Sequence, residues 1–173
     1  MRVANGWRLH EFAAFKTQKE KLEAAVEARK ASDPSGWQSS PEAKSLKAIR
    51  HLTGTAIPAA LPDTRDFRHG GTLIGDRKHW FRAKFGNGRY RLFFQFNSAA
   101  KIIIYAWVND AETLRTYGSK TDAYAVFAAM LAKGNPPDAW EDLTKAVGTQ
   151  ARASSVTAKG PTSGKPRNAR RKR

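Results

Sequence analysis

Two aromatic-rich segments joined by an Asn-Gly pair constrain the fold of this chain more than any other feature. Residues 79–85 and 90–96 flank Asn87 and Gly88, and Asn-Gly between two such runs is the strongest short-range signal for a β-hairpin. Side chains alternate between the two faces of a strand. One face of the hairpin is therefore apolar and is predicted to join the core: Phe81, Ala83, Phe85, Tyr90, Leu92, Phe94 and Phe96.

The opposite face of the predicted hairpin is basic. The turn places Lys84 directly opposite Arg91, with Arg82 and Arg89 on the same face. Like charges that face each other across two strands destabilise a sheet by up to about 1 kcal/mol. No acid relieves the seven basic residues of this region, which are Arg77, Lys78, Arg82, Lys84, Arg89, Arg91 and Lys101. An anionic ligand best explains this arrangement.

The composition supports an anionic partner. The 173 residues include 31 Lys and Arg against 15 Asp and Glu, a net charge of +16, which predicts binding to a polyanion. The absence of cysteine excludes disulfides, thiolate chemistry and zinc fingers. His, Asp and Glu show no metal-ligand spacing, so we expect no metal and no cofactor. Without a signal peptide or a membrane-length apolar run, we expect a soluble cytoplasmic protein with no membrane association.

The chain length suits one α+β domain, expected at residues 1–147. Periodicity and capping signals predict its elements. These are a short edge strand at 7–10, helices at 12–33 and 40–52 with Gly54 closing the second, a connecting segment at 54–76, a strand at 101–108, a helical turn at 112–117, and helices at 121–134 and 138–147. Residues 148–173 are almost free of large apolar side chains and are predicted to form a disordered basic tail.

The basic hairpin face suits a phosphate group, because two guanidinium groups and one ammonium group can surround its oxygens with charge-assisted hydrogen bonds. Within RNA, the same groups would stabilise a pentacoordinate transition state. The alternative is a solvated or purely binding face. His69 and His79 are each either proton-transfer groups or ordinary hydrogen-bonding residues. Tyr117 is either a core aromatic or a stacking platform for a base.

Several separated motifs between residues 5 and 145 resemble the YhaV toxins, which belong to the RelE-like group of bacterial toxin–antitoxin systems. They are Phe67-Arg68-His69-Gly70, the run from Trp80 to Phe94, Trp107-Val108-Asn109-Asp110, the run from Thr113 to Tyr124, and Gly134-Asn135-Pro136-Pro137 with Trp140. The resemblance implies a RelE-like small antiparallel sheet, with N-terminal helices packed on one face and a C-terminal helix.

The resemblance also implies a function and partners. The function is that of a toxin that cleaves mRNA without a metal ion, in association with the ribosome, and so inhibits translation and growth. The implied partner is an antitoxin of the PrlF type, which neutralises the toxin. Through that antitoxin, the complex would bind the operator DNA of the shared operon.

Matching the RelE catalytic pattern implies roles for particular residues. Two basic residues one position apart match Arg82 and Lys84, the arginine of the next strand matches Arg91, and the tyrosine matches Tyr117. Lys84 is then the base or a transition-state stabiliser, and the two arginines clamp the phosphate. Tyr117 orients or stacks on the substrate.

One arginine of that pattern is missing, because its position falls near Ala111. Arg115 is the candidate substitute, and His79 is the alternative proton donor to the leaving oxygen. The residues expected to bind RNA or phosphate beside the catalytic set are Arg77, Lys78, His79, Arg89 and Arg115.

Two other functions are open. A basic protein that only occupies RNA or the ribosome would also block translation. The gyrase-directed ParE branch of the same superfamily is a further possibility, although its members lack the basic set found at Arg82, Lys84 and Arg91. The basic tail is expected to act as an electrostatic tether to ribosomal RNA.

Overall fold

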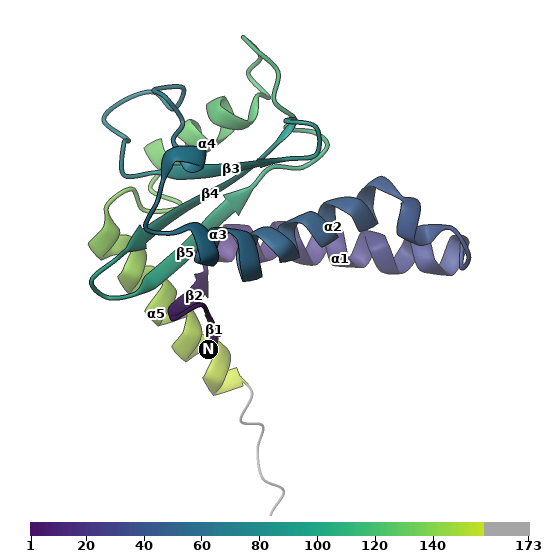
Figure 1. The fold of residues 1–173 in the computed structure, drawn as a ribbon, viewed down its shortest axis with the longest axis horizontal. Coiled ribbons are helices and arrows are strands. Elements are labelled where there is room, and N and C mark those ends of the chain that lie inside the picture. Colours follow the sequence, from purple (N-terminus) through teal and green to yellow (C-terminus); the bar gives the residue numbers. More distant parts are fainter. Residues whose placement is uncertain (158–173) are drawn as a thin grey trace, which may run out of the picture.

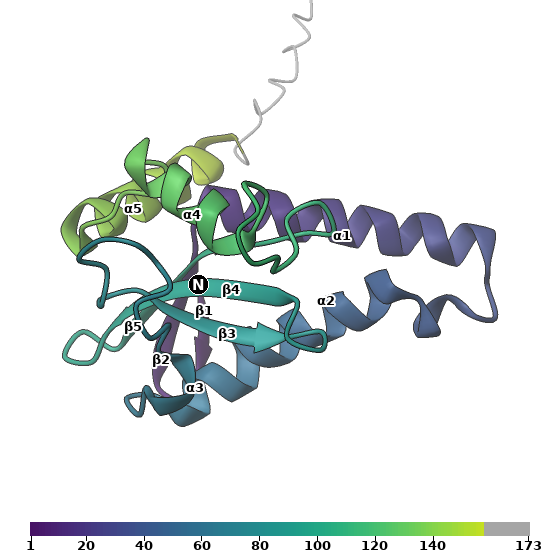
Figure 2. The ribbon, with the colours of Figure 1, turned by 90° about the horizontal axis from the view of Figure 1, so that it is seen from above.

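The computed structural model describes residues 1–157, which form a five-stranded sheet with helices on both faces (Figures 1 and 2). The strand order is β1-β2-β5-β4-β3. The strands are β1 (Arg2–Ala4), β2 (Trp7–Glu11), β3 (Phe81–Phe85), β4 (Tyr90–Asn97) and β5 (Ile102–Val108). The α+β class is confirmed.

The sheet is mixed rather than wholly antiparallel. β3, β4 and β5 form the expected antiparallel unit, but β2 runs parallel to β5. Moreover, β2 is not an edge strand, because β1 pairs with its outer side. Parallel strands need a long connection, usually a helix, between them. The long helix Ala13–Ser32, which follows β2 and lies against β5, forms part of that connection.

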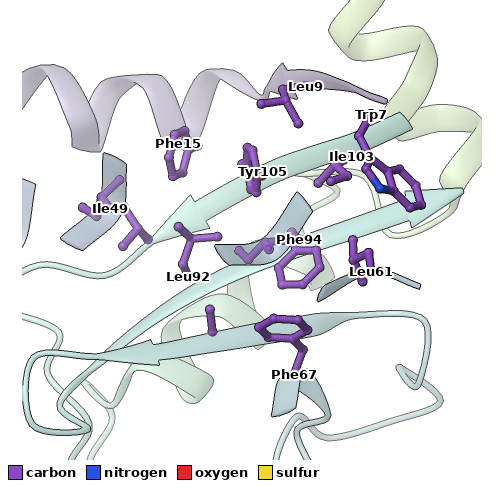
Figure 3. Packing of buried hydrophobic residues seen from close by; sticks show 13 residues of the cluster. Trp7, Leu9, Phe15, Ile49, Leu61, Phe67, Leu92, Phe94, Ile103 and Tyr105 are labelled. Atoms are coloured by element: carbon purple, nitrogen blue, oxygen red, sulfur yellow. The ribbon is translucent and has the colours of Figure 1, made fainter. Parts of the chain in front are cut away.

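The N-terminal helices cover one face of the sheet, as predicted. They are α1 (Ala13–Ser32), α2 (Pro41–His51) and the short α3 (Ile57–Ala60). Figure 3 shows the cluster beneath them. It contains Trp7, Leu9, Phe15, Ile49, Ile57, Leu61, Phe67, Ala83, Leu92, Phe94, Ile103, Tyr105 and Val108. The apolar face of the β3–β4 hairpin therefore does join the core.

The C-terminal helices cover the opposite face. α4 (Ala123–Ala132) and α5 (Trp140–Thr157) pack there over a second cluster that includes Phe93, Ile104 and Phe127. The rings of Phe93 and Phe127 are stacked with centroids 4.2 Å apart. Because both faces are covered, β5 is apolar at almost every position.

The second helix does not end at Gly54. A π-helical turn, η2 (Leu52–Ala56), joins α2 directly to α3. The buried hydroxyl of Tyr105 donates a hydrogen bond to the carbonyl oxygen of Thr53 over 2.7 Å. This contact from the sheet stabilises an irregular turn that local propensity disfavours. The connecting segment therefore runs only from Leu61 to Trp80.

Two further boundaries differ from the prediction. Residues 112–117 form turns without a helix. α5 continues to Thr157, past its predicted end at Val147. The remainder of the predicted tail, residues 158–173, lies outside the described residues. Within residues 1–157, no helix has the length and apolar character needed to cross a membrane.

Candidate active site

The β3–β4 hairpin has the register that the sequence predicts. Asn87 and Gly88 occupy the turn with φ values of 55° and 74°, a region in which Asn and Gly are the favoured residues. Lys84 is paired with Arg91 across the two strands. The structure therefore contains the predicted pair of like charges.

Arg82 and Arg91 are buried side chains that converge on one tyrosine. They are 9% and 6% exposed, and the Nε atom of each donates to the hydroxyl oxygen of Tyr124 over 3.1 Å. Backbone carbonyls take further hydrogen bonds from both. Nη1 of Arg82 donates to the oxygen of Asp66 over 2.9 Å, and Nη1 of Arg91 donates to the oxygen of Gly88 over 2.6 Å.

These two guanidinium groups lack acidic partners. Among residues 1–157, no carboxylate lies within 4.0 Å of Arg82 or Arg91. In the same part of the chain, nothing accepts a hydrogen bond from either Nη2 atom. Buried charges are ordinarily paired, because removing them from water is costly. The pair is therefore a preformed positive site with donors still available to an anion.

Arg115 brings a third cation to the same ring. Its guanidinium carbon lies 4.9 Å from the ring centre of Tyr124, and that of Arg91 lies 5.6 Å from it. Burial by itself lowers the pKa of Arg115, but the hydrogen bond from Nη1 to Asp122 Oδ1 at 2.5 Å and the charge of Asp122 outweigh it and raise the pKa above its ordinary value. We call Arg82, Arg91 and Arg115, gathered around Tyr124, the arginine cluster.

Asp122 links this cluster to the fold. Its side chain caps α4, as the sequence predicts, by accepting from the backbone N–H of Tyr124 over 3.0 Å. The same carboxylate accepts from the N–H of Thr116 over 2.6 Å and holds Arg115. One buried acid therefore positions both a cation and the helix that carries the central tyrosine.

The loop after β5 is fastened to the hairpin by Asn109. Its Oδ1 accepts from the backbone N–H of Arg91 over 2.7 Å, and its Nδ2 donates to the carbonyl oxygens of Arg89 at 3.2 Å and Thr113 at 2.8 Å. The backbone N–H of Arg115 also donates to the carbonyl oxygen of Arg89, over 2.9 Å. These contacts place Arg115 beside β4, although it is distant from β4 in the sequence.

Lys84, Arg89 and Tyr117 are exposed near the cluster. Lys84 precedes Phe85 at the end of β3, and no carboxylate within residues 1–157 pairs with it. Tyr117 is 87% exposed and lies under the Arg115 guanidinium carbon, which is 3.9 Å from its ring centre. The structure therefore makes Tyr117 an accessible platform rather than a core residue.

Arg77, Lys78 and His79 lie at the opposite end of β3. His79 Nε2 is 3.0 Å from Asp138 Oδ1, and Arg77 Nε is 3.9 Å from the other oxygen of that carboxylate. Arg82, the cluster member nearest to His79 in the sequence, is three residues away, and among the described residues no hydrogen bond or ring contact joins the two side chains. The structure engages His79 with Asp138 rather than with the arginine cluster, and its role as the proton donor stays a prediction.

Sequence reasoning missed two residues of the site, Tyr124 and Asn109. Asn109 directly follows the apolar run of β5, which was expected to lie beside the hairpin. Its polar side chain at that position could have indicated a contact with the hairpin. For Tyr124 the only local signal was its place just after the Asp122 cap. Tyr117, the tyrosine that the family pattern selects, does not contact Arg82 or Arg91 through any hydrogen bond among the described residues.

Comparison with known proteins identifies the family to which the chain and this site belong. A family model described as a toxin with endonuclease activity, of a toxin–antitoxin system, matches residues 9–148. The chain belongs to the YhaV toxin family. Toxin YhaV of Escherichia coli O6:H1 is 46% identical to it over 142 residues, which are 82% of this chain and 92% of the relative. Ribonuclease toxin YhaV of Escherichia coli K12 is 45% identical over the same shares. No solved structure matches the chain.

Membership of the YhaV family confirms the resemblance predicted from the sequence. The chain is a toxin with endonuclease activity, and an antitoxin is its partner. The matched residues include the whole arginine cluster and the hairpin. The site described above is thus part of the region that the YhaV family shares.

Proposed function

We propose that the chain is an endoribonuclease that cleaves mRNA, and that the arginine cluster and Lys84 hold the scissile phosphodiester. One observation carries this proposal: Arg82 and Arg91 are buried, share the Tyr124 hydroxyl, have no carboxylate partner within residues 1–157 and keep free Nη2 donors. Such preorganised donors stabilise negative charge as it develops. The name of the K12 relative, a ribonuclease toxin, supports RNA as the substrate.

RNA brings its own nucleophile to this site. The 2′-hydroxyl oxygen attacks the adjacent phosphorus, the bond from phosphorus to the 5′-oxygen breaks, and the leaving oxygen takes up a proton. The products are a 2′,3′-cyclic phosphate and a 5′-hydroxyl. The route uses only charge stabilisation and proton transfer, so it needs no metal ion.

The geometry suggests a catalytic or positioning role for each residue of the site. Arg82 and Arg91 bind the non-bridging phosphate oxygens, and Lys84 beside them acts as the base or stabilises the transition state. Arg115 faces the same space and stabilises charge on the leaving oxygen. Tyr124 orients the arginines, and Tyr117 offers an exposed ring on which a base can stack.

We propose partners in line with this reaction. The antitoxin is of the PrlF type, and its complex with the toxin binds operator DNA. The toxin acts on mRNA at the ribosome, in the cytoplasm, where its substrate is found. The net charge of +16 supports association with ribosomal RNA, and residues 148–173 are proposed to contribute to it as a tether.

The test is cleavage of a 5′-labelled mRNA by the purified chain, with and without ribosomes and with EDTA present, followed by end-group analysis. We expect fragments that end in 2′,3′-cyclic phosphate. Lys84→Ala should abolish them, and because Lys84 is exposed, the fold should remain intact. Lys44→Ala, which removes an exposed lysine of α2, is the matched control and should cleave normally.

Two results would overturn the proposal. Equal cleavage by Lys84→Ala and the wild type would separate the reaction from the hairpin. Intact RNA in every lane, from protein that still arrests growth, would favour a toxin that blocks translation by occupancy. In that case the basic hairpin face would be a docking surface.

A further inference from the structure

The segment between α3 and β3 is an ordered loop built around His69. This side chain is 9% exposed. Its Nδ1 accepts from the backbone N–H groups of Gly71 at 3.2 Å and Leu73 at 3.4 Å, so its Nε2 carries the proton and donates to the carbonyl oxygen of Arg77 over 2.9 Å. Leu73 is 1% exposed and packs in the second core cluster. His69 is therefore a structural residue, and the loop is held in one shape.

This loop borders an open hollow of about 460 Å³ beside β3. The volume lies in the range of ligand pockets, roughly 300–1,000 Å³. The residues that line it are Thr64, Arg68, His69, Gly70, Gly71, Lys78, Trp80 and Phe81. A Cβ at Gly70 or Gly71 would have no atom within 4 Å, so the loop leaves open space above both glycines.

Two cations face this hollow without acidic partners. Nε of Arg68 donates to the hydroxyl of Thr64 over 3.1 Å, which leaves its Nη groups available. Neither Arg68 nor Lys78 forms an ion pair within the part of the chain that the structure describes. Arg65, in the same loop, differs because it is paired with Asp63 at 2.5 Å.

The hollow adjoins the arginine cluster. Trp80 and Phe81 line it, and the next residue along β3 is Arg82. Nη1 of Arg82 donates to the carbonyl oxygen of Asp66 in the same loop over 2.9 Å. Arg68 follows Asp66 by two residues, about 7 Å at most, and Lys78 precedes Arg82 by four, about 13 Å at most. Their long side chains can therefore reach the phosphate of a neighbouring nucleotide.

We propose that Arg68 and Lys78 form a second anion subsite, which binds the phosphodiester next to the scissile one. The inference rests on the proposed ribonuclease function. An RNA strand that leaves the arginine cluster toward the N-terminal end of β3 passes these two cations. Half-buried Phe81 forms an apolar side of the hollow against which a ribose or base can pack. The subsite adds binding energy and fixes the strand direction without touching the reacting atoms.

The experiment uses the full-length double variant Arg68→Gln, Lys78→Gln. Counterion release changes the slope of log affinity against log salt by about 0.7 per phosphate contact on a single strand. Binding of a non-cleavable 2′-O-methyl RNA should therefore lose about 0.7 from its slope, because the subsite holds one phosphate, which corresponds to an affinity about fourfold weaker at 0.15 M salt. With a cleavable RNA, we expect KM to rise by a similar factor while kcat stays unchanged.

Two controls make the result specific. Arg65→Gln removes one exposed, carboxylate-paired cation of the same loop and should leave the salt slope and KM unchanged. A dinucleoside monophosphate contains only the scissile phosphate, so the double variant and the wild type should cleave it with equal kcat/KM. The melting temperature of each variant checks that the loop remains folded.

The outcomes separate this inference from the proposed function. If the wild type cleaves RNA and the double variant matches it in slope and KM, the subsite is wrong and the ribonuclease stands. An equal loss on the dinucleoside monophosphate would make Arg68 and Lys78 part of the scissile site and would also overturn the inference. A wild type that neither cleaves nor binds RNA would overturn both proposals.

Discussion

Replacing Tyr124 with Phe tests whether one hydroxyl organises the arginine cluster. The ring and its packing against Phe93 remain, but the Nε–H groups of Arg82 and Arg91 lose their shared acceptor. A hydrogen bond to a charged group contributes about 1.5–3 kcal/mol, so two give an upper bound of about 6 kcal/mol. Both side chains retain slight exposure, and water replaces part of the loss. We expect a destabilisation of about 2–4 kcal/mol.

The same substitution should slow cleavage more than it weakens binding. A shift of about 1 Å in a positioning group can reduce the rate about 10²-fold, and both arginines of the proposed phosphate site are free to move once the hydroxyl is gone. Urea unfolding gives the stability change, and single-turnover cleavage of labelled RNA gives the rate. Tyr117→Phe is the matched control, because that side chain is 87% exposed. A Tyr124→Phe variant as stable and as active as the Tyr117→Phe variant would refute the reasoning.

Two further predictions concern the core and the loop after β5. Phe127→Ala removes a fully buried ring stacked on Phe93 and should lower the free energy of unfolding by about 3–5 kcal/mol in urea denaturation; a loss under 1 kcal/mol would contradict the packing. Burial alone raises the pKa of Asp110, but hydrogen bonds from Thr113 and Gln18 outweigh it and lower the pKa below its ordinary value. Its contribution to stability is therefore complete above about pH 4 and is lost as the pH falls further. Asp110→Asn should show a smaller loss of stability on acidification from pH 5 to pH 2, and an unchanged acid profile would refute this.

The hairpin was predictable because its signals are local. Asn87 and Gly88 set the turn, and the alternation of apolar and basic residues in 81–85 and 90–96 sets the faces. Since the register follows from the turn, the opposition of Lys84 and Arg91 could be derived before any tertiary contact was known. The Asp122 cap of α4 is local in the same sense.

Features that depend on distant contacts were not predictable. Glycine costs about 1 kcal/mol inside a helix, yet Gly54 does not stop the helical path, because Tyr105 supports the π-helical turn from the sheet. A side chain at Gly54 would meet only the guanidinium end of the exposed, flexible Arg2 side chain, which can move aside. The parallel pairing of β2 with β5 likewise joins segments far apart in the sequence.

Tyr124 also shows that contacts between distant residues could not be predicted from the sequence. The spacing of the family pattern selects Tyr117, whereas the arginines contact Tyr124. Which tyrosine reaches them depends on the path of the loop after β5, and Asn109 and the Arg115 backbone determine that path through contacts to Arg89. The residue types therefore predicted that arginines and a tyrosine lie together better than they predicted which tyrosine Arg82 and Arg91 contact.

The opposition of Lys84 and Arg91 shows how the fold tolerates charge that it does not neutralise. Arg91 directs its donors to the carbonyl oxygens of Gly88 and Tyr90 and to the hydroxyl of Tyr124, while Lys84 stays in water. Neutral acceptors satisfy the N–H groups but leave the positive charge in place. A carboxylate at position 124 would stabilise the buried guanidinium groups further, but it would cancel the positive field that the proposed phosphate site requires. A hydroxyl at this position thus preserves the electrostatic potential on which anion binding depends.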